Sequence, residues 1–326
     1  MKKTGNTHIY LSEFRGTFIF LLCGIGCVGA LKLAGASFGQ WEISIVWGLA
    51  VTMGVYVCGG VCGAHLNPSV TIALALFGDF DKRKVVPYIL VQMVAGFCAA
   101  ALAYAMYYNL FADAVAATAG DPAKMTALAG IFCTFPHPKI TFFQAFFVEL
   151  VITAVLMCLI YALVDGRNTA PKGNLGGLLI GLLVALIGAS FGPLTGFAMN
   201  AARDFGPRLF AALAGWGTDV MTGYPLNDNL SLPYFLVPLI APIIADLMGP
   251  EVALIDPGRE TALAARDALA SAGLLREGRA GTARYYVSDT TESFAQLSDW
   301  FLGEYAGGPV TRISVDGYPV EQGAST

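Results

Sequence analysis

The sequence contains one short motif twice, each time between apolar segments. Residues 63–69 read Gly-Ala-His-Leu-Asn-Pro-Ser, and residues 196–204 read Gly-Phe-Ala-Met-Asn-Ala-Ala-Arg-Asp. Each copy begins with residues that favour irregular backbone and continues into a short apolar run. Asn67 and Asn200 stand between the two parts, and because Asn is a preferred N-cap, we expect a short helix to start at each. In a membrane, two such half-helices can aim their positive N-termini at one point, which builds a polar site without a formal charge.

The segments around these motifs are apolar enough to lie in a bilayer. Hydrophobic residues make up 56% of the chain and charged residues 13%, and the mean hydropathy is +0.63. This composition is typical of a polytopic helical membrane protein. The net charge of −4 gives no indication of a nucleic-acid partner. Apolar runs of about 20 residues, the length that spans the hydrocarbon core, lie at 11–33, 41–61, 85–107, 142–164 and 176–194.

Two shorter apolar runs, 68–78 and 201–214, follow the Asn motifs directly, and we expect them to be re-entrant half-helices. A carboxylate precedes each motif at a similar interval: Glu13 by 54 residues and Glu149 by 51. Each half then holds three spans and one half-helix. The odd number of spans inverts the second half relative to the first. The two half-helices therefore enter the membrane from opposite faces and meet near its midplane.

Glu13 and Glu149 lie inside predicted spans, where an isolated carboxylate costs roughly 2.5–3.5 kcal/mol. One interpretation is a proton relay in a transporter. The other is structural, with each carboxylate accepting backbone N–H groups of the irregular segment in its own half. The matched repeat positions favour the structural interpretation.

The irregular residues before each Asn lie at membrane depth, where such backbone is tolerated only if its carbonyls line a cavity. We expect a row of carbonyl acceptors and two Asn donors, which suits hydroxyl groups or water. Two positive helix ends at one point also repel cations, including protons. The expected pore-lining carbonyls belong to Gly63, Ala64, His65, Leu66, Ala198 and Met199.

Arg203 directly follows the second half-helix start and faces lipid only at high cost. We expect its guanidinium to face water in the pore, bind a solute hydroxyl and repel cations; the alternative is a salt bridge to Asp204. His65 is either a packed polar loop residue or offers only its backbone carbonyl to the pore. The spacings of the seven cysteines match neither a zinc site nor a disulfide framework, apart from the turn-like Cys58–Cys62 pair. We therefore expect the cysteines to act as small apolar side chains, and we expect no metal or cofactor.

Basic residues gather in the loops of one side, which the positive-inside rule places in the cytoplasm together with the N-terminus. The opposite loops are poorer in cations, and one of them, 108–141, is long for a connection. The cytoplasmic group comprises Lys2, Lys3, Arg15, Lys82, Arg83, Lys84, Arg167 and Lys172.

With these residues in place, the chain resembles the major intrinsic protein family, and within it the bacterial glycerol facilitators, or aquaglyceroporins. The resemblance runs from about residue 13 to 242 and is carried by Gly-Gln-Trp-Glu-Ile-Ser at 39–44, Phe-Asp-Lys-Arg-Lys-Val at 80–85, Gly-Pro-Leu-Thr-Gly-Phe at 192–197 and the two Asn motifs. It implies an all-α membrane fold of six spans and two half-helices, a homotetramer with one pore per subunit, and a bacterial inner-membrane location.

The resemblance also implies a narrow selectivity filter formed here by Trp47, Gly188, Phe197 and Arg203. The two aromatic rings can contact the carbon backbone of a polyol, and Arg203 can donate hydrogen bonds to its hydroxyls. Gly188 has no side chain and so keeps the filter wide. Asp204 also resembles the glycerol branch, with Glu13, Glu149 and Asp204 as structural supports. The family motif Asn-Pro-Ala is altered in both copies, which read Asn67-Pro68-Ser69 and Asn200-Ala201-Ala202. Because Ala is a good helix former, we expect conduction to survive the loss of Pro at position 201.

The C-terminal part departs from this pattern. A sixth span begins near Leu232, but Asp246 interrupts it after about 14 apolar residues, short of the roughly 20 required. We therefore expect a channel domain over 1–248 and a soluble fragment over 249–326. The fragment alternates strand-like and helical patterns, at 252–255, 259–275, 283–288, 291–302 and 310–315.

From about residue 238 the tail resembles the C-terminal part of glutamate racemases, through Glu-Val-Ala-Leu-Ile-Asp at 251–256, Gly-Arg-Glu-Thr-Ala at 258–262, Tyr-Val-Ser-Asp at 286–289 and Phe-Leu-Gly at 301–303. Racemization in that family depends on two Cys residues, and the tail has none. We expect an inactive fragment; an ordinary hydrophilic tail is the alternative.

Three functions follow from these patterns. The favoured one is a passive channel for glycerol and related small neutral polyols, with some water, that excludes ions and protons and is not an enzyme. The alternatives are a proton-coupled transporter that uses Glu13 and Glu149, and a fusion with a racemase fragment. Two alternatives remain for the closing span. Either 233–255 still crosses the membrane, or the channel has five spans and its wall is incompletely closed where the sixth should lie.

Overall fold

The computed structural model describes residues 6–165, 173–224 and 226–248, together with the short pieces 270–271, 285–287 and 310–312. The chain divides into two compact units, Met1–Ala253 and Leu254–Thr326.

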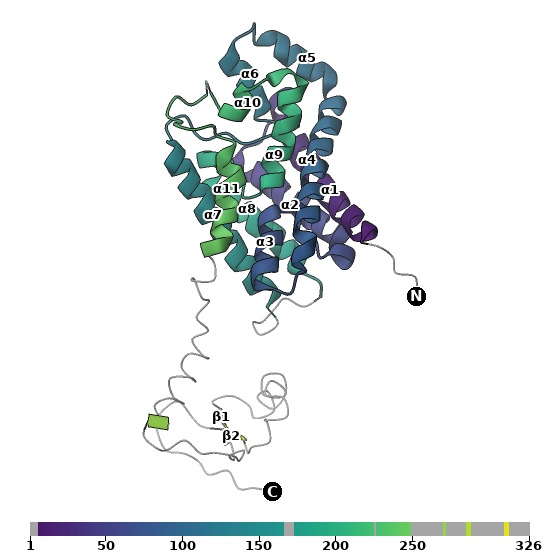
Figure 1. Cartoon of the computed structure of the whole chain (residues 1–326), viewed down its shortest axis with the longest axis vertical. Helices are drawn as coiled ribbons and strands as arrows, with labels where there is room; N and C mark the ends of the chain where they lie inside the picture. The colour runs from purple at the N-terminus through teal and green to yellow at the C-terminus, as the bar shows by residue number, and fades with distance from the viewer. Residues whose placement is uncertain are drawn as a thin grey trace. The chain divides into compact units, whose positions relative to one another are not determined.

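The regular elements described in the first unit are all helices, and Figure 1 shows them packed side by side. In chain order the elements are α1 (Thr7–Leu33), α2 (Gln40–Cys62), α3 (Pro68–Phe77), η1 (Lys82–Lys84), α4 (Val85–Met106), α5 (Tyr108–Ala117), α6 (Pro122–Ala129), α7 (Phe142–Val164), α8 (Gly176–Thr195), α9 (Ala201–Ala211), η2 (Ala212–Trp216), α10 (Asp219–Thr222) and α11 (Leu236–Met248).

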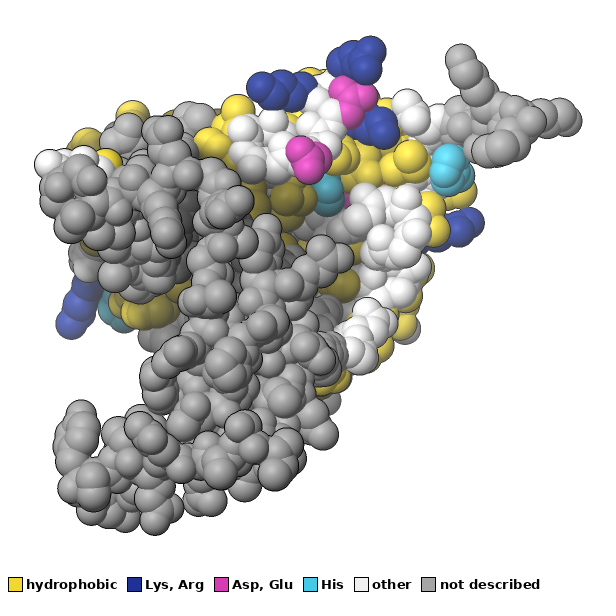
Figure 2. All heavy atoms as spheres, turned by 90° about the horizontal axis from the view of Figure 1, so that it is seen from below, with side chains coloured by type: hydrophobic (Ala, Val, Ile, Leu, Met, Phe, Trp, Pro, Cys, Tyr) yellow, Lys and Arg dark blue, Asp and Glu magenta, His cyan; other side chains and the backbone are white. Residues whose placement is uncertain are grey.

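Five of these helices, α1, α2, α4, α7 and α8, are long and apolar enough to cross a membrane. Their outward faces carry large exposed hydrophobic side chains such as Leu90, Phe147 and Leu186. A surface of this kind is stable only against lipid or another protein. The view from below in Figure 2 likewise shows hydrophobic side chains over much of the described surface, with a few charged ones among them. The expected class, an all-α polytopic membrane protein, is confirmed.

Helices α2 and α8 cross at Gly48 and Gly181, and these glycines are 133 residues apart, as Asn67 and Asn200 are. A Cβ at Gly181 would lie 2.0 Å from Thr52 Oγ1 and 2.4 Å from Gly48 O, so only glycine permits this approach. The two halves of the repeat therefore meet at equivalent positions, which the duplicated motif predicts.

The half-helices expected after the two Asn motifs are α3, with 10 residues, and α9, with 11. Both are too short to span a bilayer, since an α-helix rises about 1.5 Å per residue. Each packs against α4 of the first half and α11 of the second. This cross-packing fixes the half-helices between the halves.

The closing helix α11 has 13 residues and is about 20 Å long. Its apolar part ends at Ala245, close to where the sequence predicts an interruption, and it packs against α7, α3 and α9. The described side chains end at Ala245, so the side chain of Asp246 lies outside the described residues. Before α11, Tyr234 is fully buried and its hydroxyl donates to Thr195 O at 3.1 Å.

Loop 108–141, which carries no motif in the sequence, contains the helices α5 and α6. An Asp at position 121 caps α6 by accepting from Ala123 N and Lys124 N, and Pro122 occupies its first position. The loop then forms a buried aromatic cluster in which Phe111 stacks on Phe132 at 5.1 Å. The segment is therefore a packed part of the first unit.

In the second unit, the strand β1 (Tyr285–Val287) pairs in parallel with β2 (Val310–Arg312), with Tyr285 opposite Val310. Both strands fall inside segments predicted as strand-like. The other predicted tail elements and most of the racemase-like stretches lie outside the described residues: 252–255, 259–275 apart from 270–271, 291–302, and the motifs at 251–256, 258–262 and 301–303.

Candidate functional site

The two half-helices begin at Asn67 and Asn200, whose side chains cap them. Asn67 Oδ1 accepts from Ser69 N at 2.9 Å. Asn200 Oδ1 accepts from Ala202 N at 2.9 Å and from Arg203 N at 3.1 Å. The second cap therefore holds two N–H groups although Ala201 replaces the usual Pro, and α9 starts at the expected residue.

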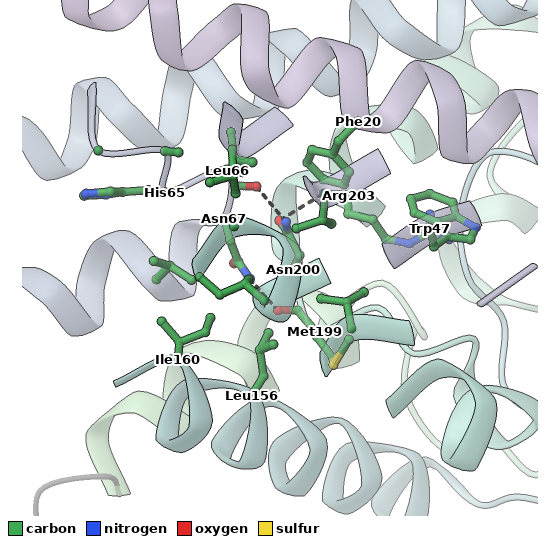
Figure 3. Close-up of a pocket in the computed structure, with 18 of the residues that line it drawn as sticks. Phe20, Trp47, His65, Leu66, Asn67, Leu156, Ile160, Met199, Asn200 and Arg203 are labelled. Carbon is green, nitrogen blue, oxygen red and sulfur yellow. Dashed lines mark hydrogen bonds between the residues drawn. The ribbon is translucent and has the colours of Figure 1, made fainter. Parts of the chain in front are cut away.

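The amide groups of the same two residues reach across to the opposite half (Figure 3). Asn67 Nδ2 donates to Met199 O at 2.8 Å, and Asn200 Nδ2 donates to Leu66 O at 2.8 Å. An Asn amide carries two N–H donors, and each of these side chains uses one of them in this bond. The two helix N-termini and their Asn amides thus converge at one point.

The backbone before each Asn alternates through the left-handed region. Positive φ angles occur at Gly63, Ala64 and Leu66, and in the second copy at Gly196, Phe197 and Met199. Non-glycine residues with this conformation cost of order 1–3 kcal/mol each and persist only where the surroundings fix them. The two segments therefore need strong local support.

In the first half that support is Glu13, a fully buried side chain on α1. Its carboxylate accepts from Leu66 N, from His65 N at 3.3 Å, from Gln92 Nε2 at 2.8 Å and from the Cys62 thiol at 3.0 Å. The carboxylate thus binds N–H groups of the segment, while the Leu66 carbonyl accepts from Asn200 Nδ2.

Glu149 on α7 has the equivalent place in the second half and is also fully buried. It accepts from Thr195 Oγ1 at 2.6 Å, Ala198 N at 3.0 Å and Met199 N at 2.8 Å. These bonds are the ones expected of structural carboxylates. Neither glutamate is among the residues that line the cavity described below.

A cavity of about 390 Å³ runs along both Asn motifs. Its wall is mostly apolar and includes the segment from Gly63 to Asn67 and that from Phe197 to Asn200. The other lining residues are Phe20, Trp47, Val51, Val55, Val70, Leu74, Leu156, Ile160, Val164, Gly176, Gly177, Ile180, Val184 and Arg203. The cavity therefore offers a narrow line of polar groups on an otherwise apolar surface.

Three of the four residues expected to form a filter meet at one end of this cavity. The Arg203 guanidinium carbon lies 4.0 Å from the centre of the Trp47 ring, and Arg203 Nη1 donates to Phe132 O at 3.2 Å. The rings of Trp47 and Phe197 are 6.5 Å apart and nearly perpendicular. Figure 3 shows Arg203 extending from α9 toward Trp47.

Gly188 has a different place from the one expected, because it does not line the cavity. A Cβ at this position would lie 2.8 Å from Phe197 Cε2 and 3.0 Å from Ser44 Oγ. Its carbonyl accepts from Gln40 Nε2 at 2.9 Å. Gly188 thus leaves space for the Phe197 ring rather than for a solute directly.

His65 combines both interpretations made from the sequence. Its backbone borders the cavity, while its ring packs between Phe80 and Tyr88, with centroids 4.5 and 4.8 Å away. Its Nδ1 lies 3.1 Å from Thr71 Oγ1. In Figure 3 the ring points away from the two Asn residues.

Asp204 does not pair with Arg203 among the described ion pairs; its partner is Arg208, one turn further along α9. The Asp204 carboxylate accepts from Arg208 Nε at 2.6 Å, Thr134 N at 2.8 Å and Thr134 Oγ1 at 2.7 Å. Arg208 is fully buried and also donates to Thr134 O and Val220 O. This network joins α9 to the loop that carries Phe132, the carbonyl partner of Arg203.

Arg208 and Thr134 were not among the residues expected from the sequence. The spacing of four residues between Asp204 and Arg208 is a signal for an ion pair on one helix. No signal of this kind marks Thr134, which is 70 residues away in the chain.

Comparisons with known proteins agree with this geometry. The model of the family described as major intrinsic protein matches residues 1–252. A glycerol uptake facilitator protein from Shigella flexneri is 58% identical over 241 residues, which cover 73% of this chain and 84% of the relative. A propanediol uptake facilitator, PduF, from Citrobacter freundii is 52% identical over 241 residues, which cover 73% of this chain and 88% of the relative.

Among solved structures, the X-ray structure of the aquaglyceroporin from Plasmodium falciparum matches with a TM-score of 0.67 and 30% identity, covering 78% of this chain and 98% of that one. The glutamate racemase resemblance of the tail rests on the sequence alone. The extent of the family match and the identity to these relatives show that the chain belongs to the major intrinsic protein family.

Proposed function

We propose that this protein is a passive channel for glycerol and related small neutral polyols, with some water, and that it excludes ions and protons. The observation that carries the proposal is the convergence of two Asn-capped half-helices on one cavity, with Trp47, Phe197 and Arg203 at one end. The glycerol and propanediol facilitators among the relatives support the substrate class.

A polyol has hydroxyl groups along one edge and carbon along the other. The backbone carbonyls before the Asn residues accept hydrogen bonds from its hydroxyls, and Asn67 and Asn200 donate to these hydroxyls. The apolar wall, including Leu156 and Ile160, contacts the carbon side. A water molecule satisfies the same polar groups but gains nothing from the apolar wall.

Ion exclusion has a separate cause. The N-termini of α3 and α9 each carry about half a positive charge, and both face the cavity. The Arg203 guanidinium adds a full positive charge at the cavity end. A cation, or a proton carried on water, therefore meets a repulsive electrostatic potential in the cavity. It must also give up much of its hydration shell to enter this narrow site.

The assembly and location belong to the same proposal. We infer a homotetramer in a bacterial inner membrane, with the N-terminus and the basic segment η1 on the cytoplasmic side. The exposed apolar faces of α2 and α4 offer surface for lipid and for neighbouring subunits.

The test is stopped-flow light scattering on proteoliposomes that contain the full chain, with water, glycerol and urea as separate solutes. We expect glycerol flux that rises linearly with the gradient and does not depend on a proton gradient. Saturable uptake driven by a proton gradient would contradict the channel and favour a coupled transporter. Glycerol flux equal to that of empty liposomes would contradict both.

A further inference from the structure

Three metal-ligating side chains meet beside the pore wall, and two of them, both cysteines, have no part in the proposed channel mechanism. They are Glu13 on α1 and the pair Cys58 and Cys62, which lie one turn apart on α2. Each offers one ligand atom, and these atoms all lie within 4.8 Å of one another. All three side chains are buried, and none lines the cavity.

The thiols make only weak hydrogen bonds. The Cys58 thiol donates to Gly54 O at 3.1 Å, and the Cys62 sulfur lies 3.0 Å from Glu13 Oε2 and 3.2 Å from Cys58 O. Thiols are weak donors, so their replacement by metal–sulfur bonds removes little stabilisation.

We propose that Glu13, Cys58 and Cys62 form a binding site for a thiophilic divalent cation, and that the bound ion reduces flux through the pore. On binding, two S–H bonds break, two protons leave to water, and two metal–sulfur bonds form, while Glu13 Oε2 supplies a third ligand. No oxidation state changes. A zinc–sulfur bond is about 2.3 Å long, and the three ligand atoms lie within 4.8 Å of one another, so small side-chain movements bring them around one ion.

The chemistry of the site favours this class of ion. Thiolates are soft ligands and select soft or borderline metals over Ca²⁺ or Mg²⁺. Two thiolates neutralise a divalent charge, which matters in a membrane interior where an unpaired charge is costly. Cys62 directly precedes Gly63, which lines the cavity.

The link to the pore passes through Glu13. Its Oε2 atom accepts from His65 N at 3.3 Å, and an ion that binds Oε2 withdraws it from this donor. The next residue, Leu66, has its carbonyl bonded to Asn200 Nδ2 at 2.8 Å. A shift of residues 65–66 therefore moves the amide that faces the solute.

The second half of the chain provides an internal comparison. Thr195 stands 133 residues after Cys62 and donates its hydroxyl to Glu149 at 2.6 Å. The position equivalent to Cys58 is Phe191. The second half thus keeps the donor to its glutamate without thiols, and Cys62→Thr copies that solution into the first half.

The experiment uses the full chain in proteoliposomes with Cd²⁺ as the probe. Binding is followed by thiolate-to-Cd²⁺ charge-transfer absorption in the ultraviolet, and glycerol flux is measured on the same preparation, before and after a chelator. The variants are Cys62→Thr and Cys58→Ser, and the matched control is the double variant Cys23→Ser/Cys98→Ser, which removes two cysteines elsewhere.

We expect Cd²⁺ to produce the absorption and slow glycerol flux in the parent protein and in the control, with recovery after chelation. Each site variant should weaken Cd²⁺ binding by roughly tenfold or more, since even outer partners of metal ligands contribute that much. Absent absorption in the parent, or full absorption in both site variants, overturns the metal site. Binding without any change in flux overturns the inhibition.

Only the flux measurement rests on the proposed function. If the parent conducts no glycerol before Cd²⁺ is added, the channel proposal fails, while the absorption titration still decides the metal site. If Cys62→Thr does not fold, Cys58→Ser gives the same decision.

Discussion

Adding one methyl group at Gly188 should narrow the pore indirectly, through Phe197. The new Cβ would lie 2.8 Å from Phe197 Cε2 and 2.9 Å from Cζ. Because carbon atoms pack at about 3.5–4.0 Å, the ring must move by about 1 Å. Ser44 Oγ, 3.0 Å from the same Cβ, limits movement of the new group in the other direction.

The size of the effect follows from this contact. Overpacking of a well-packed site costs about 1–3 kcal/mol. A glycerol molecule that passes between Phe197 and Arg203 must push the displaced ring back against the new methyl group, so part of that cost is added to its barrier. With about 1.4 kcal/mol for each factor of ten in rate, Gly188→Ala should lower glycerol flux about tenfold. Water needs less width, so its flux should fall less than about threefold.

The assay is stopped-flow light scattering of proteoliposomes matched for protein content. Gly26→Ala is the control, because a Cβ at Gly26 on α1 meets no atom within 4 Å, and it should conduct like the parent. In the double variant Gly188→Ala/Phe197→Leu, the smaller side chain should restore much of the glycerol flux. An unchanged ratio of glycerol to water flux in Gly188→Ala would refute the reasoning.

Three further predictions follow from the site. Glu149→Gln replaces an acceptor with an NH₂ group that faces backbone donors, so the variant should lose about 1–3 kcal/mol of stability, measured as faster denaturant-induced unfolding in detergent; unfolding at the parental rate would contradict the structural role. Arg208→Met leaves the buried Asp204 carboxylate without its ion-pair partner and should cost about 3–5 kcal/mol, whereas Asp204→Asn/Arg208→Met should recover a large part of it; equal losses in both variants would show that the pair is not coupled. Ala201→Pro should leave glycerol flux close to the parental value, because Asn200 already caps α9 through two N–H groups; a rise from no flux to normal flux would show that Ala201 inactivates the channel.

The sequence alone predicted the parts of the site that depend on local chemistry. An Asn before a short apolar run is an N-cap signal, and its repetition at 67 and 200 predicted α3 and α9. Glu13 and Glu149 were assigned to their own irregular segments because the carboxylates recur at similar intervals. These features need only the order of residues along the chain, since the repeat itself encodes the symmetry.

The closing helix was also predictable in outline. An apolar run that stops near 246 cannot give a full span, and α11 ends its apolar part at Ala245. The packing of α11 against α7 could not be predicted from this apolar segment. A helix that is apolar on all sides does not specify which neighbouring helix it contacts.

Only the tertiary structure decided how the cavity end is built. Gly188 leaves space for the Phe197 ring rather than lining the cavity, and Asp204 pairs with Arg208 rather than Arg203. Thr134 joins this network from 70 residues away. Such contacts depend on the packing distance between elements that are remote in the chain, and a linear pattern carries no information about that distance. The sequence thus determined which polar groups lie near the two Asn motifs, and the packing determined which of them line the cavity.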